Sequence, residues 1–195
     1  PEDVGKCLLT IANHFIMLED YENALPLYKE AYQLALEHKS IELQQVSGIM
    51  LIKYLCGAGY YSESLEYYNK IKPEIAFNPS MQNEVVKSYM ELNKPDSARI
   101  YLAARLLSER GDKIVLNCMM AETYIPEGQE DSAFVFLDRA MKSYKEKAKN
   151  YQKQGREAIL PNCFLSPCYL FADLLWKKGK IQQASQYYMI VEPLM

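Results

Sequence analysis

Few residues of this chain have the types and spacing that catalysis or metal binding requires. The chain of 195 residues has only two histidines, His14 and His38. Its five cysteines do not include the two closely spaced pairs that a cysteine-ligated zinc site requires. The run Gly57-Ala58-Gly59 lacks the Lys-Ser/Thr that follows in a phosphate-binding loop. We therefore expect no catalytic residues, no metal site and no cofactor. We expect buried free thiols at the five cysteine positions, 7, 56, 118, 163 and 168.

Composition narrows the class of protein further. Hydrophobic residues make up 49% of the chain, which is enough to form a packed core. The net charge of −3 gives no overall attraction to nucleic acid or to an anionic membrane. The longest uncharged stretch, 158–172, is too short to span a bilayer, and no apolar signal region opens the chain. We expect no membrane contact, and the cytoplasm and the bacterial periplasm both remain open as compartments.

One basic run stands out against this acidic balance. It could form an electrostatic footprint for an acidic partner or nucleic acid, or it could be the solvated face of a protruding helix, which is the interpretation that we favour. Its residues are Lys142, Lys145, Lys147, Lys149, Lys153 and Arg156.

The sequence predicts that helices position any residues that bind a ligand. Apolar residues recur at helical spacing, as in Leu8, Ile11, Ala12 and Phe15, and short polar breaks separate these segments. The pattern predicts an all-α fold with helices over 4–18, 22–38, 41–57, 61–72, 79–92, 96–110, 113–125, 130–154, 164–178 and 181–193.

These helices recur in pairs. A small residue follows the turn inside each pair, at positions 24, 64, 98, 133 and 184, so that the intervals are 40, 34, 35 and 51 residues. A helix-turn-helix unit of 34 residues with a small residue at this position resembles the tetratricopeptide repeat (TPR). The resemblance implies a right-handed superhelical solenoid of about five repeats in a single domain over 1–195. The repeats lie near 5–40, 45–78, 79–112, 113–160 and 161–195.

Two of the intervals, 40 and 51 residues, are well above 34, and the extra residues predict where helices or loops are extended. About six extra residues lie around 37–42, and about seventeen lie in 145–161. Because the helical period continues through the second insertion, we expect the helix that begins near 130 to overrun its repeat and to end near Gly155. Arg105 stands where the third repeat should have a second small residue.

The resemblance also implies a function, because the first helices of TPR-like pairs line a concave face that binds protein or peptide segments. On this basis we expect partner-binding residues in a polar row with apolar neighbours, namely Asn13, Lys53, Lys87, Glu122 and Asp173 with Ile49, Met90 and Trp176. The carboxylate clamp of chaperone-binding TPR domains is not expected, because Leu9, Met50, Ser80 and Glu84 replace four of its five residues.

Two further functions remain open at this stage. The Asp-Ser-Ala runs at 96–98 and 131–133 resemble repeats in the sensory halves of bacterial membrane-anchored regulators, which implies a ligand-sensing domain whose output module is not in this chain. A scaffold that assembles through its ends is the third class. Helix 181–193 favours self-association, because Tyr187, Tyr188, Met189 and the residues after them are apolar on nearly all sides.

Overall fold

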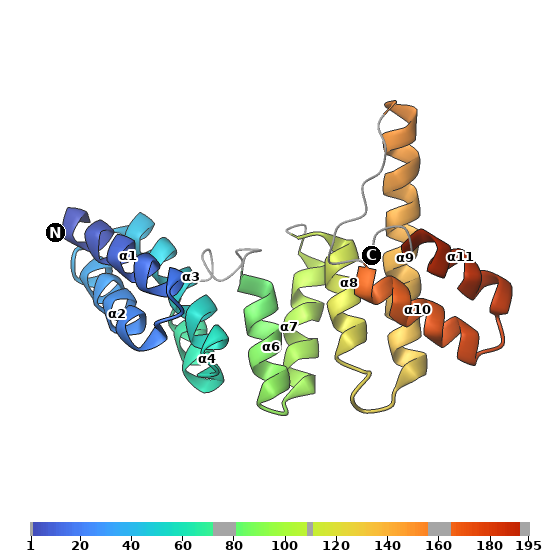
Figure 1. Ribbon diagram of the computed structural model, residues 1–195, viewed down its shortest axis with the longest axis horizontal. Coiled ribbons are helices and arrows are strands. Elements are labelled where there is room, and N and C mark those ends of the chain that lie inside the picture. Colours follow the sequence, from blue (N-terminus) through green and yellow to red (C-terminus); the bar gives the residue numbers. More distant parts are fainter. Residues whose placement is uncertain (1, 72–80, 109–110, 156–164, 192–195) are drawn as a thin grey trace. The chain divides into compact units, whose positions relative to one another are not determined.

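A computed structural model describes residues 2–71, 81–108, 111–155 and 165–191, and every regular element in these ranges is a helix. The helices fall into two compact units, residues 1–94 and 95–195 (Figure 1). The first unit contains α1 (Glu2–Met17), α2 (Tyr21–Glu37), α3 (Ile41–Gly57), α4 (Tyr61–Lys70) and α6 (Gln82–Glu91). The second contains α7 (Pro95–Leu107), α8 (Lys113–Glu122), α9 (Glu130–Lys153), α10 (Leu165–Lys177) and α11 (Ile181–Val191).

The turn that joins the two helices of each pair has the same geometry every time. The carbonyl of one residue near the end of the first helix accepts a hydrogen bond from the backbone N–H five residues later, and the residue before that donor has a positive φ. The acceptors are Phe15, Leu55, Tyr89, Tyr124 and Leu175, and the positive-φ residues are Glu19, Gly59, Asn93, Gly128 and Gly179. Both sets have the intervals 40, 34, 35 and 51 that the sequence predicts.

We call the first helix of each pair helix A (α1, α3, α6, α8 and α10) and the second helix B (α2, α4, α7, α9 and α11). The small residue near the start of every helix B is fully buried, as the sequence predicts. Its members are Ala24, Ser64, Ala98, Ala133 and Ala184, each 0% exposed. Ser64 shows how close the helices come, because its Oγ donates to the carbonyl of Ile52 on α3 at 2.9 Å. A larger side chain at Ser64 would separate α3 from α4.

Helices of the first unit pack in sequence order, α1 on α2, α2 on α3, and α3 on α4 and α6. Gly48 of α3 allows one close approach, because a Cβ atom there would lie 3.1 Å from Ile71 Cδ1 and 3.3 Å from Tyr32 of α2. Nearby, the amide of Gln44 donates to the carbonyl of Ala35 at 3.0 Å, which satisfies a polar side chain that α2 buries.

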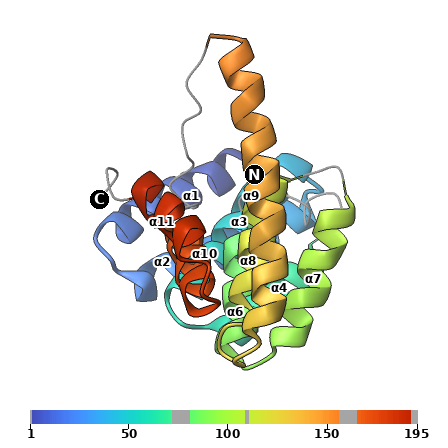
Figure 2. The same ribbon diagram turned by 90° about the vertical axis from the view of Figure 1, so that its right-hand side faces the viewer.

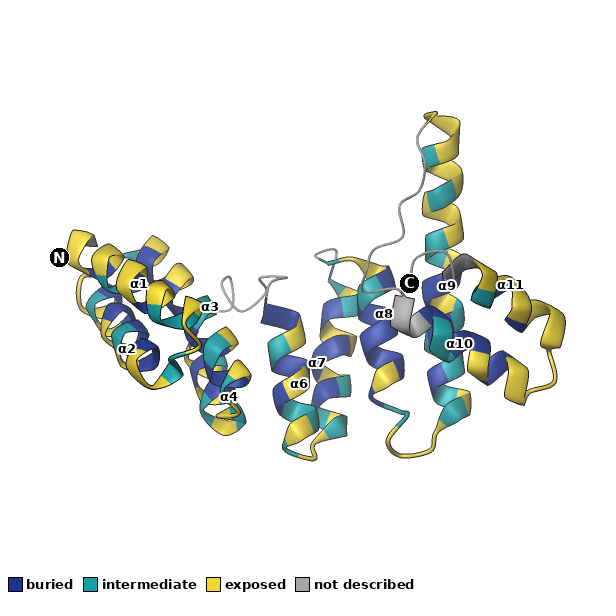
Figure 3. Ribbon diagram, viewed as in Figure 1, coloured by how far each residue is buried: buried dark blue, intermediate teal, exposed yellow. Residues whose placement is uncertain are grey.

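In the second unit, α8 packs on α9, α9 on α10 and α10 on α11, around a core that includes Leu137, Met141, Phe171 and Leu175. The carboxyl-terminal half of α9 extends past α8 and α10 (Figures 1 and 2). Most of its residues are exposed or half-buried there (Figure 3). Gly155, with a φ of 68°, follows the helix, so the predicted overrun and its end are confirmed.

The remaining fold predictions have mixed outcomes. The all-α class is confirmed, and the helices lie within a few residues of their predicted ranges. Cys56, Cys118 and Cys168 are buried free thiols as expected, whereas Cys7 is exposed, so that part of the prediction is wrong; Cys163 lies outside the described residues. Among the described helices, none has the length and apolar character needed to cross a membrane. The single domain with its five repeat boundaries stays a prediction.

Candidate functional site

Two of the predicted site residues of the first unit, Lys53 and Lys87, line one pocket. The pocket has a volume of about 240 Å³ and lies between α3 and α6, with one residue from α2. Lys53 comes from the fourth turn of α3 and Lys87 from the equivalent repeat position of α6, 34 residues later, so the repeat places both amines on the same side of successive A helices. The other lining residues are Tyr21, Tyr54, Cys56, Gly57, Asn83 and Glu84.

The amines in this pocket are available to a ligand. Both lysines are exposed, and within the described part of the chain neither forms an ion pair. Lys53 Nζ lies 5.4 Å from the centroid of the Tyr54 ring, which is a cation–π distance. Glu84 adds one carboxylate, and its Oε2 is buried without a hydrogen-bond partner. The pocket therefore offers two donors of charge-assisted hydrogen bonds and a net positive charge.

A chain of contacts links this pocket to Asn13 of α1. Tyr28 of α2 donates its hydroxyl to Asn13 Oδ1 at 2.5 Å, and its ring stacks on Tyr54 with centroids 5.2 Å apart. Burial, and then the neighbouring Tyr54, raise the pKa of Tyr28 above its ordinary value. Asn13 is thus an exposed residue whose amide oxygen already has a partner within the protein.

Ile49 and Met90, the apolar neighbours predicted for the first unit, are both half-buried. They lie on α3 and α6, the two helices that form the pocket, but they are not among the residues that line it. Their role in binding stays a prediction.

In the second unit, Asp173 and Trp176 of α10 line a separate pocket of about 230 Å³ with Ile125, Leu170 and Leu174. The charges around this pocket are already paired. Tyr188 of α11 donates its hydroxyl to Asp173, a bond that raises the pKa of Tyr188 to about 12, and Lys177 bonds Glu130 at 2.5 Å. Trp176 is 53% exposed, so its ring is the part of this pocket that remains open to a ligand.

Glu122, the remaining predicted site residue, ends α8 and lines neither of these two pockets. Although the residue as a whole is exposed, desolvation of its carboxyl group raises the pKa of Glu122.

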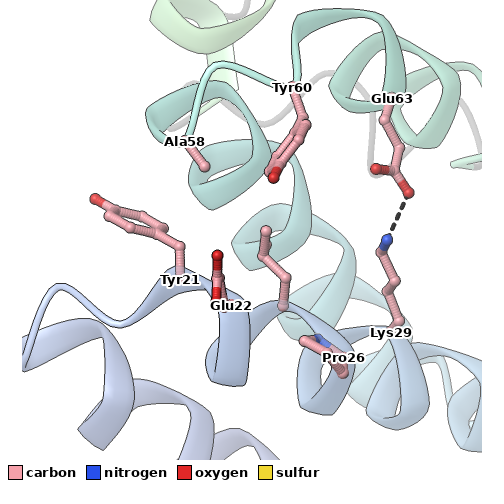
Figure 4. Close-up of a pocket in the computed structure, with 8 residues that line it drawn as sticks. Tyr21, Glu22, Pro26, Lys29, Ala58, Tyr60 and Glu63 are labelled. Carbon is pink, nitrogen blue, oxygen red and sulfur yellow. Dashed lines mark ion pairs between the residues drawn. The ribbon is translucent and has the colours of Figure 1, made fainter.

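A pocket larger than these two was missed by sequence reasoning. It has a volume of about 530 Å³ and lies between α2 and the start of α4, and its lining includes Tyr21, Glu22 and Tyr60 (Figure 4). An ion pair between Lys29 and Glu63, at 2.7 Å, closes one side. The only signal in the sequence is that Tyr21 and Tyr60 lie next to equivalent turns, and the sequence predicts only a polar break at Tyr21.

The basic run on α9 is mostly engaged within the protein. Lys142 pairs with Asp138 at 2.7 Å, Lys147 pairs with Asp112 at 3.1 Å, and Lys145 donates to the Tyr187 hydroxyl at 3.1 Å. Lys149 and Lys153 are exposed, and Arg156 lies outside the described residues. Within the described ranges, no three acidic, histidine or cysteine side chains are grouped closely enough to hold a metal ion.

Comparison with known proteins agrees with this geometry. Residues 165–189, which span α10 and most of α11, match the family model of the tetratricopeptide repeat. No curated protein sequence matches the chain significantly.

Two crystal structures share the fold. Both contain the nearly identical TPR-like repeats assigned to a kinesin light chain of Podosopora anserina, and one of them carries the substitution Q17M. The Q17M structure has a TM-score of 0.65 at 14% identity and covers 96% of this chain and 92% of its own. The other has a TM-score of 0.64 at 14% identity, with coverage of 96% and 93%. The repeated turns, the buried small residues and these matches together identify this chain as one with the TPR-like repeat fold, built from degenerate repeats.

Proposed function

We propose that this chain is a non-catalytic module that binds a protein segment, and that the pocket between α3 and α6 receives an acidic side chain of that segment. TPR repeats are generally protein-interaction modules. One observation supports this pocket over the pocket that Asp173 and Trp176 line. Lys53 and Lys87 have no ion-pair partner in the described part of the chain and are available to a ligand, whereas Asp173 already accepts a hydrogen bond from Tyr188.

The chemistry of the pocket defines the ligand. Two ammonium groups on successive A helices suit one carboxylate held between them or two neighbouring carboxylates. Each charge-assisted hydrogen bond contributes about 1.5–3 kcal/mol. The rings of Tyr21 and Tyr54 supply apolar surface beside the amines. We therefore expect an extended or helical segment with Asp or Glu next to an apolar residue.

The test screens the full chain against an array of acidic peptides and titrates the strongest peptide against variants. Reversal of both pocket charges, Lys53→Glu with Lys87→Glu, should weaken binding at least tenfold. Reversal of two exposed lysines of α9, Lys149→Glu with Lys153→Glu, makes the same change in net charge outside the pocket and should alter affinity less than twofold. Circular dichroism checks that both variants are folded.

The salt dependence gives a second readout. Because the proposed contacts are exposed ion pairs, the affinity of the unmodified chain should fall as salt is raised, and that of the pocket variant should fall less. Equal losses in the two charge-reversal variants would contradict the pocket and indicate a non-specific attraction. A loss only in the α9 variant would place the contact on the basic helix.

A further inference from the structure

The side chain of Tyr21 belongs to two pockets of the first unit. It lines the pocket of Lys53 and Lys87, and it also lines the pocket of about 530 Å³ between α2 and α4, which we call the α2–α4 pocket. Consecutive residues at the end of α3 divide in the same way, because Gly57 lines the first pocket and Ala58 lines the second. The Tyr21 ring lies against this end of α3, where a Cβ atom on Gly57 would be 3.6 Å from its hydroxyl. The two pockets are therefore neighbours that share an aromatic wall.

The α2–α4 pocket carries the opposite charge to its neighbour. Lys29 and Glu63 pair at 2.7 Å and their charges cancel, which leaves Glu22 as the remaining charged residue of the lining. Glu22 is exposed, and within the described ranges its carboxylate has neither an ion pair nor a hydrogen bond. Figure 4 shows Lys29 and Glu63 on the opposite side of the pocket from Tyr21. The unpaired carboxylate follows Tyr21 directly in the chain, so it belongs to the part of the pocket next to the shared wall.

Two tyrosine rings and an apolar surface complete this pocket. Tyr60 is 54% exposed and Tyr21 is half-buried, so both rings have accessible surface. In the part of the chain that the structure describes, no Lys or Arg lies over either ring. Leu25 and Pro26 of α2 add apolar surface. A carboxylate beside open tyrosine rings favours a cation, and a guanidinium most of all, because its plane stacks on an aromatic ring while its N–H groups bind a carboxylate.

We infer that the α2–α4 pocket receives an arginine side chain of the same partner segment whose acidic side chain enters the pocket between α3 and α6. The inference rests on the proposed function and extends it, because the segment then carries two neighbouring charges of opposite sign. The guanidinium binds Glu22 and stacks on Tyr60, and the methylene groups of the arginine lie along Leu25 and Pro26. Because the two pockets share the Tyr21 ring, only a few positions separate the acidic residue of the segment from the arginine.

The test titrates fluorescently labelled peptides with the full chain and follows their anisotropy. Each probe carries one Asp-Leu pair and one Arg, placed between one and six positions away on either side, and each has counterparts with Gln or Phe in place of Arg. At the best spacing the Arg peptide should bind at least fivefold more tightly than its Gln counterpart. Equal affinity for Arg and Gln at every spacing would overturn the inference. Tighter binding of the Phe peptide would overturn it too, because the occupant would then be apolar.

Variants of the chain locate the preference for Arg. Glu22→Gln should bring the affinities for the Arg and Gln peptides within twofold of each other. Tyr60→Leu should reduce the preference, whereas Tyr60→Phe keeps the ring and should retain it. Glu30→Gln removes one charge from an exposed position of α2 outside the pocket, so it is the matched control and should retain the preference. Circular dichroism checks that each variant is folded. A full preference in folded Glu22→Gln would contradict the site.

The same peptides separate this inference from the proposed function. Lys53→Ala with Lys87→Ala should weaken the Arg and Gln peptides by similar factors, because both peptides contain the acidic residue. If this variant leaves both affinities unchanged while Glu22→Gln still removes the preference, the proposed function fails and the arginine pocket stands. If it weakens both peptides but the unmodified chain binds Arg and Gln alike, the arginine pocket fails and the proposed function stands.

Discussion

Tyr28 of α2 donates its hydroxyl hydrogen bond to Asn13 of α1, and the same pair recurs 160 residues along the chain, where Tyr188 of α11 donates to Asp173 of α10. Both pairs join residues 15 positions apart across an identical turn. In both pairs a tyrosine of helix B holds a polar side chain of helix A. Asn13 and Asp173 belong to the polar row that the sequence predicts to bind a ligand, so two members of that row already have a partner within the protein.

Loss of this bond should destabilise the first unit. We expect Tyr28→Phe and Asn13→Ala each to lower the free energy of unfolding by about 1 kcal/mol, a typical net value for one hydrogen bond. The double variant should lose less than the sum, because the two residues act through one contact. Urea unfolding followed by circular dichroism measures all three. Additive losses would show that the hydroxyl and the amide contribute separately.

Arg99 should be the most sensitive surface cation of the second unit. Its guanidinium lies 4.0 Å from the centroid of the Tyr124 ring, and it donates to the carbonyl of Thr123 at 2.7 Å and to the Glu127 carboxylate. Lysine keeps the charge but loses the planar fork and the stacking. Arg99→Lys should therefore lower stability by about 1–3 kcal/mol. Arg139→Lys, a change at an exposed residue near Phe136, is the control and should stay within about 0.5 kcal/mol.

The turn residues predict two changes of opposite sign. Glu19 has a φ of 58°, whereas the equivalent residue of the second repeat is Gly59, with a φ of 85°. Left-handed backbone costs a residue with a Cβ about 1–2 kcal/mol. Glu19→Gly should therefore raise the melting temperature, and Gly59→Glu should lower it, as measured by calorimetry. Shifts in the same direction would mean that side-chain effects outweigh the backbone conformation.

The free energy of unfolding should also fall at alkaline pH, because the buried thiol of Cys168 ionises more easily in the unfolded chain. Cys168 is 0% exposed, and burial raises its pKa from 9.0 to about 12. The folded state holds this proton more tightly than the unfolded state. The contribution of the protonated thiol to the free energy of unfolding is therefore complete below pH 9 and is lost as the pH rises toward 12. Cys168→Ala should flatten the decline in this window by up to about 1.4 kcal/mol per pH unit. Cys7→Ala, at an exposed cysteine, should leave the slope unchanged.

The sequence predicts the repeat architecture well because its determinants are local. The small residue at each turn and the apolar period of each helix are visible without any knowledge of packing. The placement of Lys53 and Lys87 in one pocket also follows from their equivalent repeat positions.

Contacts between helices could not be predicted in the same way. The bond from Tyr28 to Asn13 depends on a hydroxyl reaching across the hairpin, and two other repeats have Leu102 and Leu137 at the tyrosine position. Tyr21 and Tyr60 look like turn residues in the sequence, and only the approach of α2 to α4 makes them walls of one pocket.

The five identical turns have a consequence for how this protein can change in length. Each hairpin keeps the same number of residues between its turn acceptor and the small residue of helix B, although the repeats differ in length from 34 to 51 residues. All of the length variation therefore falls between the small residue of one repeat and the turn acceptor of the next, that is, in helix B, in the connecting segment or in the following helix A. A foreign epitope, a cleavage site or a fluorescent tag should be tolerated between hairpins and rejected within their turns, which makes the hairpin the indivisible unit for grafting, shuffling or duplication in this chain.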